Sequence, residues 1–240
     1  MDDPSFRKLL DAFDLSWEGY RKVRKGVKKR ISRHMHELSC PSMARYLDVV
    51  DSNHEERRQC ELLLTVPISR FFRDRHLWAA IEKEILPNLL NNKIDRIKVW
   101  SACCANGEEA YSFKMIWDLV TKRFGNTPTL EILATDINPD CLKRAKNGSY
   151  SQSSLKEIPK DYINRYFDLK RNGNHFFVKP SLKKDITWKI HHMLSDPPGA
   201  VFHIIFLRNN ILTYYQDHIN EQVFRKIHAR LCPAGYLIIG

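Results

Sequence analysis

Two stretches decide the fold: residues 97–111, IKVWSACCANGEEAY, and residues 130–136, LEILATD. Ile97–Trp100 has the length and composition of a short buried strand, and a helical pattern begins at Glu108, after a polar loop with one glycine. Leu130–Ala134 predicts a second strand, roughly thirty residues after the first. A strand, a helix and a second strand in this order form a βαβ unit, which requires parallel strands.

Later segments repeat this alternation. Further helices are predicted at Pro139–Lys146 and from about Gln216 to Leu231, after the one at Glu108–Lys122. Further strands are predicted at Val201–Leu207 and Tyr236–Ile239. We therefore expect an α/β fold with a doubly wound, mostly parallel sheet.

One segment, from Gly148 to about His191, breaks the alternation. It contains two β-type runs, His175–Val178 and Ile186–Ile190, and an Asn172-Gly173 turn signal. Such a pattern is typical of a hairpin. We therefore expect a small antiparallel β insertion here.

The first 64 residues predict helices, because apolar residues recur every three or four positions. These helices are expected over residues 5–13, 16–38, 46–50 and 55–64. Pro67 then favours an extended segment, and residues 71–90 again have helical spacing. We expect an N-terminal helical domain over 1–64, a linker with a connecting helix over 65–93, and an α/β domain over 94–240 that carries the insertion at about 148–191.

The second predicted helix is strongly basic. Its apolar positions form one stripe, and its other faces hold eight cations between Arg21 and Arg33 with no acid among them. These cations are Arg21, Lys22, Arg24, Lys25, Lys28, Lys29, Arg30 and Arg33. Two interpretations stay open: a solvated helix surface, or a face that attracts an acidic partner.

Bulk composition sets further limits. The 240 residues are 43% hydrophobic and carry a net charge of +11, with no apolar run of the roughly 20 residues that span a bilayer. The acidic start, Met1-Asp2-Asp3, does not resemble a signal peptide, so we expect a cytoplasmic protein without membrane insertion. The six cysteines lack metal-ligand spacing, so we expect reduced thiols and no metal site.

The loop after the first strand and the end of the second suggest a ligand. In doubly wound sheets a nucleotide binds at the carboxyl ends of the strands, and a carboxylate there often holds the ribose. Asp136 stands at that position. Residues 101–109 contain a single glycine and no GxGxxG fingerprint, which favours a cofactor without phosphates, such as S-adenosylmethionine. An Asp that merely caps the next helix is the alternative.

Several motifs together resemble the chemotaxis receptor glutamate methyltransferases, the CheR family. The similarity extends over about residues 15–240, in order and at plausible spacing. The matching segments are Trp100–Ala102 with Asn106–Ser112, Thr65–Arg73, Ala134–Ile137, Ala145–Tyr150, Ile186–Trp188, Leu207–Asn210 and Leu231–Gly240. In the family the chain continues for a short tail beyond the residue that matches Gly240, which favours a truncated chain.

This resemblance implies S-adenosylmethionine as cofactor, S-adenosylhomocysteine as product, and a methyltransferase domain over 94–240. The implied cofactor-binding residues are Ser69, Arg73, Ala102, Gly107, Glu109, Asp136, Ile137, His192, Met193, Asn209 and Asn210. Tyr214 matches an active-site tyrosine if one extra residue is allowed after Asn209. Three positions depart from the family's pattern: Pro67, Cys103 and His192.

The implied reaction is attack of a glutamate carboxylate on the sulfonium methyl. That nucleophile is ionised at pH 7, so no general base is needed. A cation could orient it, and Arg73 and Arg208 are the candidates, unless each only pairs with Glu109 or Asp136.

The resemblance implies a partner as well: an acidic helical protein, a chemoreceptor cytoplasmic domain, that docks on the basic face Arg21–Arg33. Whether the β insertion binds a receptor tail stays open. Alternatives are another acidic protein substrate and a non-catalytic cofactor sensor. A nucleic-acid module is disfavoured, because the basic run lacks interleaved aromatic residues.

Overall fold

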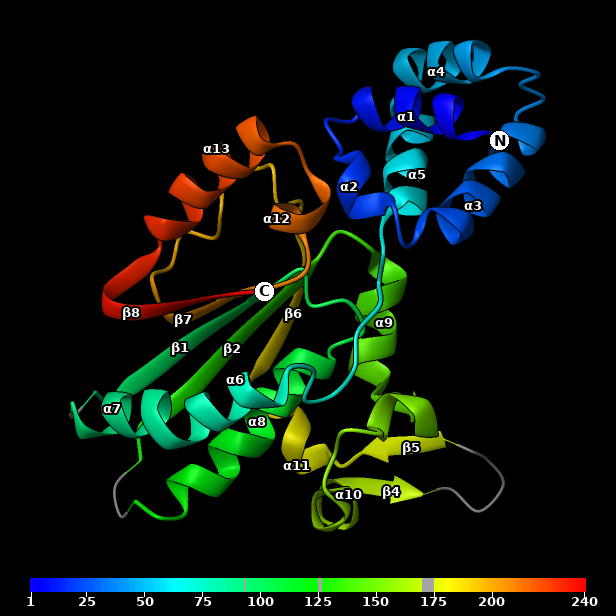
Figure 1. Ribbon diagram of the computed structural model, residues 1–240. Coiled ribbons are helices and arrows are strands. Elements are labelled where there is room, and N and C mark those ends of the chain that lie inside the picture. Colours follow the sequence, from blue (N-terminus) through cyan, green and yellow to red (C-terminus); the bar gives the residue numbers. More distant parts are fainter. Residues whose placement is uncertain (93, 125–126, 170–174) are drawn as a thin grey trace. The chain divides into compact units, whose positions relative to one another are not determined.

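A five-stranded parallel sheet is the centre of the computed structural model, which describes residues 1–92, 94–124, 127–169 and 175–240 (Figure 1). The strand order is β6-β2-β1-β7-β8, and every pairing between neighbours is parallel. The strands are β1 (Arg96–Ala102), β2 (Thr129–Asp136), β6 (Ile186–Ile190), β7 (Phe202–Leu207) and β8 (Leu231–Ile239). The predicted α/β fold class is confirmed.

Three of the helices between these strands were predicted from the sequence. They are α8 (Glu108–Thr121), α9 (Pro139–Asn147) and α13 (Asp217–His228), the last of which ends three residues before the predicted Leu231. The short helix α12 (Ile211–Tyr214) was not predicted. β1 is buried along most of its length, because it lies between β2 and β7 and helices cover it. This explains why Ile97–Trp100 shows little alternation of polar and apolar residues.

The antiparallel insertion exists, but it is smaller than predicted. Its sheet has the order β3-β5-β4, formed by β3 (Ser149–Ser151), β4 (Phe167–Leu169) and β5 (His175–Val178). The prediction that Ile186–Ile190 belongs to it is wrong. That strand, β6, is an edge strand of the main sheet and pairs with β2 from Ile132↔Ile186 to Asp136↔Ile190. A half-exposed edge strand alternates like a hairpin strand, so its pattern could not distinguish the two. The Asn172-Gly173 turn signal lies outside the described residues.

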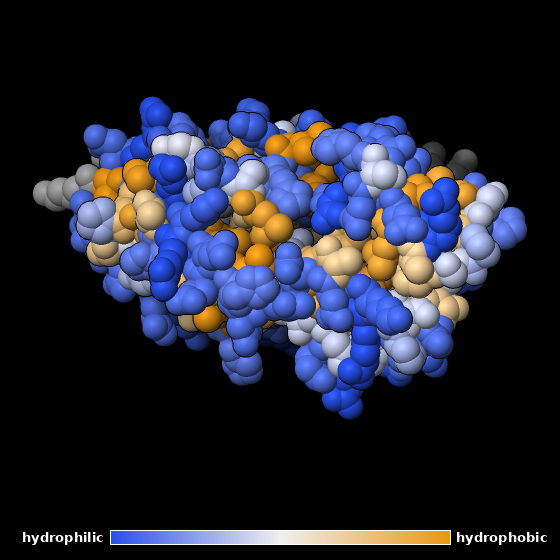
Figure 2. Space-filling model, turned by 90° about the horizontal axis from the view of Figure 1, so that it is seen from above, coloured by the Kyte–Doolittle hydropathy of each residue, from blue (hydrophilic) through white to orange (hydrophobic). Residues whose placement is uncertain are grey.

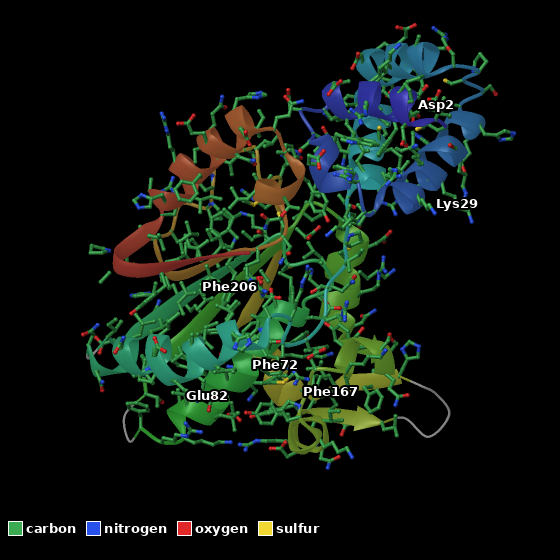
Figure 3. All side chains as sticks on the ribbon, viewed as in Figure 1. Asp2, Lys29, Phe72, Glu82, Phe167 and Phe206 are labelled. Carbon is green, nitrogen blue, oxygen red and sulfur yellow. The ribbon has the colours of Figure 1, made fainter. Side chains whose placement is uncertain are left out.

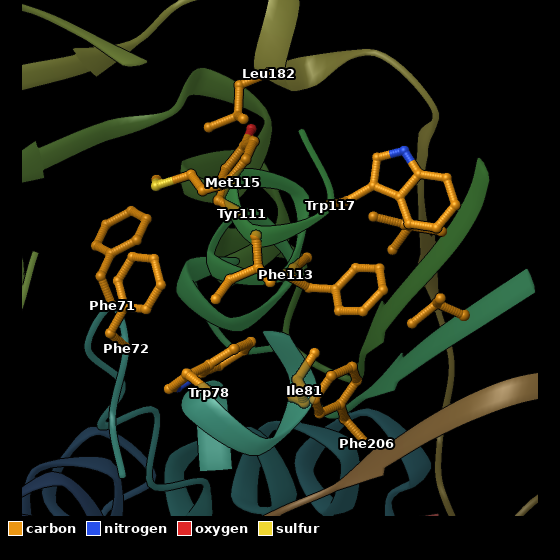
Figure 4. Packing of buried hydrophobic residues seen from close by; sticks show 14 of the residues in the cluster. Phe71, Phe72, Trp78, Ile81, Tyr111, Phe113, Met115, Trp117, Leu182 and Phe206 are labelled. Carbon is orange, nitrogen blue, oxygen red and sulfur yellow. The ribbon is translucent and has the colours of Figure 1, made fainter. Parts of the chain in front are cut away.

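An aromatic core holds the helices on the main sheet (Figure 4). Phe206 of β7 stacks with Trp78 at a ring distance of 5.8 Å and meets Phe113 of α8 edge-on at 5.7 Å. Trp78 comes from the helical run that follows the linker. That run is α6 (Arg75–Ala80), a π-helical turn η1 (Ile81–Ile85) and α7 (Leu86–Asn91). The predicted helix therefore starts after the Phe71-Phe72 pair, which lies in a turn. The remaining short elements are η2 (Gln152–Leu155), α10 (Lys160–Tyr166) and α11 (Pro180–Lys183).

Contacts divide the chain into two compact units. The sheet unit comprises residues 67–208 and 226–240, and the N-terminal unit comprises residues 1–66 and 209–225. The domain boundaries predicted from the sequence remain a prediction. No helix among the described residues is long and apolar enough to cross a membrane.

The N-terminal unit has its own apolar core, built around Phe6, Ile31 and Tyr46. Its helices are α1 (Asp3–Asp11), α2 (Trp17–Tyr20), α3 (Arg24–Glu37), α4 (Met43–Ser52) and α5 (His54–Leu64). Ser42 is the N-cap of α4. The Ser42 hydroxyl oxygen accepts a hydrogen bond from the Arg45 amide at 3.2 Å, one of the amides that the first helical turn leaves without a partner.

The prediction of one helix over residues 16–38 is wrong, because the helix is interrupted between Tyr20, where α2 ends, and Arg24, where α3 begins. The cause is tertiary packing inside the same unit. Gly19 lies so close to the Thr213 carbonyl oxygen that an added Cβ would be 2.0 Å from it. Tyr20 also meets Tyr214 edge-on at 5.1 Å. Packing of α2 on α12 outweighs the helical periodicity of the sequence.

The eight cations of the basic face divide into two groups. Arg30 donates to the carbonyl oxygens of Leu63 (2.9 Å) and Thr65 (2.7 Å), at the end of α5. Lys28 and Arg24 both pair with Asp3 of α1. The expectation that all eight lie away from the packed core is therefore wrong for three of them. Five are exposed: Arg21, Lys22, Lys25, Lys29 and Arg33.

Replacing Arg30 by Ala should destabilise the N-terminal unit. The substitution leaves two half-buried carbonyl oxygens without a charged donor, which costs about 1–3 kcal/mol. Urea unfolding followed by circular dichroism measures the loss. Arg33→Ala is the matched control, since Arg33 is exposed on the same helix and should change stability by no more than about 0.5 kcal/mol. Equal losses in both variants would contradict a structural role for Arg30.

Candidate functional site

The carboxyl ends of parallel strands meet at one edge of the sheet, and most of the predicted site residues of the sheet unit follow these ends. Ala102 ends β1 and pairs with Thr135, next to Asp136 at the end of β2. Asp136 pairs in turn with Ile190, the last residue of β6, so His192 and Met193 follow directly at the same edge. Arg208 comes directly after β7.

Asp136 organises the loop that follows β1. Its Oδ2 accepts a hydrogen bond from the Ala105 amide (2.8 Å), and its Oδ1 accepts one from the Asn138 amide (2.9 Å). The side chain spans two loops, since Ala105 follows β1 and Asn138 follows β2. Cys103 and Ala105 both have a positive φ, a conformation that costs free energy in residues with a side chain. The Asp136 carboxylate therefore helps to hold a strained loop in place.

Burial shapes the electrostatics of this loop. Asp136 is 8% exposed, and burial raises its pKa, while hydrogen bonds from the amides of Asn138, Ala105 and Ile137 counteract the rise. Burial raises the pKa of the Cys103 and Cys104 thiols well above the ordinary value, and the nearby Asp136 adds to this. These thiols stay protonated at neutral pH, so they are poor nucleophiles and act as small apolar groups.

Gly107 is required where the loop meets α8. Its φ is +89°, in the left-handed region, and an added Cβ would lie 2.7 Å from the Trp188 ring and 2.9 Å from the Ala145 side chain. The preceding Asn106 is fixed as well, because the Tyr150 hydroxyl donates to its carbonyl oxygen at 2.5 Å. Gly107 thus serves close packing of the loop on its own sheet unit, a role that the resemblance alone did not indicate.

Glu109 is a largely buried carboxylate, with a side chain 13% exposed, that is held from two sides. The Ser101 hydroxyl donates to Oε1 at 2.7 Å, and Arg208 Nη1 donates to Oε2 at 3.3 Å. Burial raises the pKa of Glu109, and the Arg208 charge is the largest of the effects that oppose this rise. The side chain is therefore fixed in position before any ligand arrives. Ser101 has this supporting role although the sequence offered it only as part of a motif.

The linker brings Arg73 toward the same group of residues, since the charge of Arg73 also lowers the pKa of Glu109. The Trp78 indole donates to the Arg73 carbonyl oxygen at 2.7 Å, and the Phe72 amide donates to the Ser112 hydroxyl at 3.0 Å. Ser112 belongs to α8, so the linker is attached to the helix that also carries Glu109. Arg73 itself remains half-buried.

Glu108 is a residue that the sequence analysis missed. It is 2% exposed at the first position of α8. Burial raises its pKa, and a hydrogen bond with the Ser69 side chain opposes the rise. Ser69, predicted as a cofactor contact, is thus also a linker residue tied to α8. An acid at a helix start usually stays exposed and interacts with the helix dipole, so the sequence gave no signal of burial.

His192 is held by its own turn. Its Nδ1 accepts a hydrogen bond from the Leu194 amide at 3.1 Å, and its carbonyl oxygen accepts one from the Ser195 amide at 3.0 Å. Met193 is buried beside it. His192 therefore has one ring nitrogen, Nδ1, committed to the local backbone.

Three predicted residues group with the N-terminal unit instead: Asn209, Asn210 and Tyr214. The Asn210 carbonyl oxygen accepts hydrogen bonds from Thr213 and Tyr214, both at 2.9 Å, and so begins α12. Tyr214 packs on Tyr20, and its carbonyl oxygen accepts a hydrogen bond from the Ser16 amide at 2.8 Å. Their part in a site remains a prediction.

Known proteins are similar to this sequence over most of its length. A chemotaxis protein methyltransferase of Listeria monocytogenes is 35% identical over 178 residues, which cover 74% of this chain and 65% of that protein. Chemotaxis protein methyltransferase 1 of Pseudomonas aeruginosa is 27% identical over 220 residues, or 89% of this chain and 80% of that protein. An uncharacterized 104.1 kDa protein of Rhodobacter capsulatus is 28% identical over 216 residues, or 89% of this chain and 22% of that protein. The chain thus spans less than two thirds of the Listeria and Rhodobacter proteins.

The family model described as "CheR methyltransferase, SAM binding domain" matches residues 68–240. This segment includes the whole sheet unit except its first residue, and therefore Asp136, Glu109, Gly107 and the loop that they order. The resemblance drawn from the sequence is confirmed, and the cofactor of this domain is S-adenosylmethionine. The chain belongs to the CheR methyltransferase family.

Proposed function

We propose that this protein transfers a methyl group from S-adenosylmethionine to a glutamate carboxylate of an acidic helical protein and so forms a methyl ester. The observation that carries the proposal is a pair of fixed carboxylates, the buried Asp136 and the largely buried Glu109, at the carboxyl edge of a sheet that the family's SAM binding domain matches. Both side chains are held in place by the chain itself, which lowers the cost of ordering them around a ligand.

The chemistry of this edge fits the cofactor. The Asp136 oxygens accept hydrogen bonds from backbone amides, among them those of Ala105 and Asn138, and keep acceptor capacity for a ribose hydroxyl. Glu109 and Arg73 offer opposite charges to the amino acid end, which is a zwitterion. The loop holds one glycine and no phosphate cradle, and the cofactor has no phosphates. When bound, S-adenosylmethionine supplies a methyl group on a sulfonium that a nucleophile can displace.

Beyond binding the cofactor, the protein has to align the glutamate carboxylate with the sulfonium methyl and exclude water from between them. A glutamate carboxylate is ionised at neutral pH, so the chain need not provide a general base. Arg73 is the better of the two candidate cations for orienting it, because the Arg208 charge is already paired with Glu109 and Asp74. Holding two reactants in line can provide several kcal/mol of the barrier reduction. Arg73 and Tyr214 as catalytic residues remain part of the proposal.

Four exposed cations favour an acidic helical substrate. Lys25, Lys29 and Arg33 follow one another at intervals of four on α3, and Lys22 precedes them; we call these four the basic stripe. Residues four apart lie on one face of a helix. The stripe takes part in none of the ion pairs found among the described residues. Figure 3 shows Lys29 pointing away from the helices of its unit, and hydrophilic residues predominate on the face drawn in Figure 2.

A chemoreceptor cytoplasmic domain is the substrate we propose, because two of the relatives above are named chemotaxis protein methyltransferases. Another acidic protein is the second candidate, since the basic stripe selects for charge and helical spacing rather than for one receptor. The two are separated by the identity of the protein that becomes labelled.

Incubation with methyl-labelled S-adenosylmethionine and a lysate of the source organism, separated afterwards into membrane and soluble fractions, tests the function. We expect label on a receptor-sized membrane protein and its release as methanol in mild base, because carboxyl methyl esters hydrolyse there and N-methyl groups do not. Base-stable label would contradict ester formation. Base-labile label on a soluble protein instead would favour the second substrate.

Asp136→Ala should weaken binding of S-adenosylhomocysteine by about 1–3 kcal/mol, since charge-assisted hydrogen bonds to ribose are lost. Calorimetry measures the change. An analogue that lacks the ribose 2′-hydroxyl separates direct contact from loop disorder, because a contact to that hydroxyl makes the two losses non-additive. Fully additive losses would assign the Asp136 effect to the loop alone. Asp140→Ala, at the exposed start of α9, is the control.

Reversing Lys22, Lys25 and Lys29 to Glu should raise KM for the protein substrate about tenfold at low salt, because a charged patch speeds encounter. Affinity for S-adenosylhomocysteine should stay unchanged, as no candidate cofactor residue lies on α3. The difference should shrink toward 1 M salt, where the Debye length is about 3 Å.

The matched control is a triple variant with the same change in net charge at exposed positions of the sheet unit: Lys143, Lys156 and Lys160 replaced by Glu. An equal rise of KM in both triple variants would assign the effect to net charge. No rise in either would leave the stripe as a solvated helix surface.

A further inference from the structure

We propose that Arg208 is a positioning residue, which fixes the linker turn at residues 71–74 to Glu109 and so sets Arg73 and Glu109 in place before any ligand binds. The proposal rests on the proposed function for the roles of Arg73 and Glu109. Its structural part, a linker turn fastened by Arg208, can be tested without any methyl transfer.

The guanidinium of Arg208 connects two segments that are far apart in the sequence. Nη1 donates to Glu109 Oε2 at 3.3 Å, on the first turn of α8. Nη2 donates to the Arg73 carbonyl oxygen at 3.2 Å and to the Asp74 carboxylate, both in the linker. A planar fork with several donors can hold such a bridge, which a lysine ammonium cannot reproduce.

The burial of Arg208 speaks against direct contact with a substrate. Its side chain is 4% exposed, and its guanidinium lies 6.0 Å from the centre of the Trp78 ring. Its Nε is buried and has no hydrogen-bond partner among the described residues. Two carboxylates, Glu109 and Asp74, already offset its single charge. The group is therefore committed to the protein and not free to orient an incoming carboxylate.

The linker turn needs such a fastening. Phe72 and Asp74 both have a positive φ, of 51° and 64°, and neither is a glycine. Residues in this region persist only where the surroundings over-determine them. The Phe72 amide is bound to Ser112, and Trp78 binds the Arg73 carbonyl oxygen. Arg208, which directly follows β7, adds hydrogen bonds to the Arg73 carbonyl oxygen and the Asp74 carboxylate.

Arg73 gains its position from this turn. Among the residues that the structure describes, its side chain makes one weak hydrogen bond, from Nη1 to the Ile68 carbonyl oxygen at 3.4 Å. Its backbone, by contrast, is held through its carbonyl oxygen by both Arg208 and Trp78. A fixed backbone with a loosely held side chain is what a ligand-contacting arginine requires. Arg208 therefore acts on a ligand through Arg73 and Glu109.

Asp74→Asn is the sharpest test. Asp74 is 58% exposed, so the variant should fold, and Asn tolerates a positive φ. The Glu109–Arg208 pair stays intact, while the charge-assisted tie to the linker is lost. Arg208→Lys breaks the fork but keeps the charge beside Glu109. Arg75→Ala is the control, because the neighbouring Arg75 is 70% exposed and pairs only with Glu157.

Hydrogen exchange of the peptide 68–78, without ligand, is the first readout. We expect faster exchange of the Phe72 amide in Asp74→Asn and Arg208→Lys and unchanged exchange in Arg75→Ala. Calorimetry with S-adenosylhomocysteine is the second readout, with a Kd that rises on the order of tenfold or more in both variants. The double variant should bind S-adenosylhomocysteine no more weakly than the single variant with the higher Kd, because both substitutions remove the same interaction between Arg208 and Asp74.

Unchanged exchange and unchanged Kd in Asp74→Asn would overturn the proposal. A fall of kcat alone in Arg208→Lys, at saturating cofactor and with normal exchange, would overturn it too and make Arg208 an orienting cation. If the parent protein methylates nothing, the proposed function fails, but exchange and binding still decide the role of Arg208.

Discussion

The hydrogen bonds between the Asp136 carboxylate and the amides of Ala105 and Asn138 are the interaction on which the candidate site depends. They join the loops that follow two neighbouring parallel strands, and they do so at a buried position where an unpaired carboxylate would be costly. Without them, the strained residues Cys103 and Ala105 would lose their anchor. The position of α8, and with it Glu109, follows from this loop.

A second constraint comes from the linker. Residues 67–74 precede the first strand, yet they are attached to α8 through Ser69 and Glu108, through Phe72 and Ser112, and through Arg208. The site is thus assembled from the ends of strands and from a segment outside the sheet. A linker that is fixed at several points can contribute side chains as reliably as a strand does, because its backbone has no alternative conformation of similar energy.

The sequence predicted the strands and helices of the sheet well, because buried parallel strands and amphipathic helices leave distinct patterns. It also predicted that Asp136 stands where the second strand ends, since that place follows from the alternation of strands and helices. It misassigned β6, whose alternation fits a hairpin or an edge strand equally. It missed Glu108 and the break between Tyr20 and Arg24, because both depend on residues that lie far away in the chain and pack there. Local pattern carries no information on such partners.

The roles of the charged residues are also hard to predict from a local sequence pattern. Eight cations between Arg21 and Arg33 look equivalent in the sequence, but Arg30, Lys28 and Arg24 hold the N-terminal unit together. In the sheet unit Arg73 and Arg208 looked like interchangeable candidates, whereas one has a loosely held side chain and the other is buried between two carboxylates. An arginine buried with its acids stabilises geometry, because its charge is already neutralised locally. Only a cation without such partners projects a field that a substrate can sense.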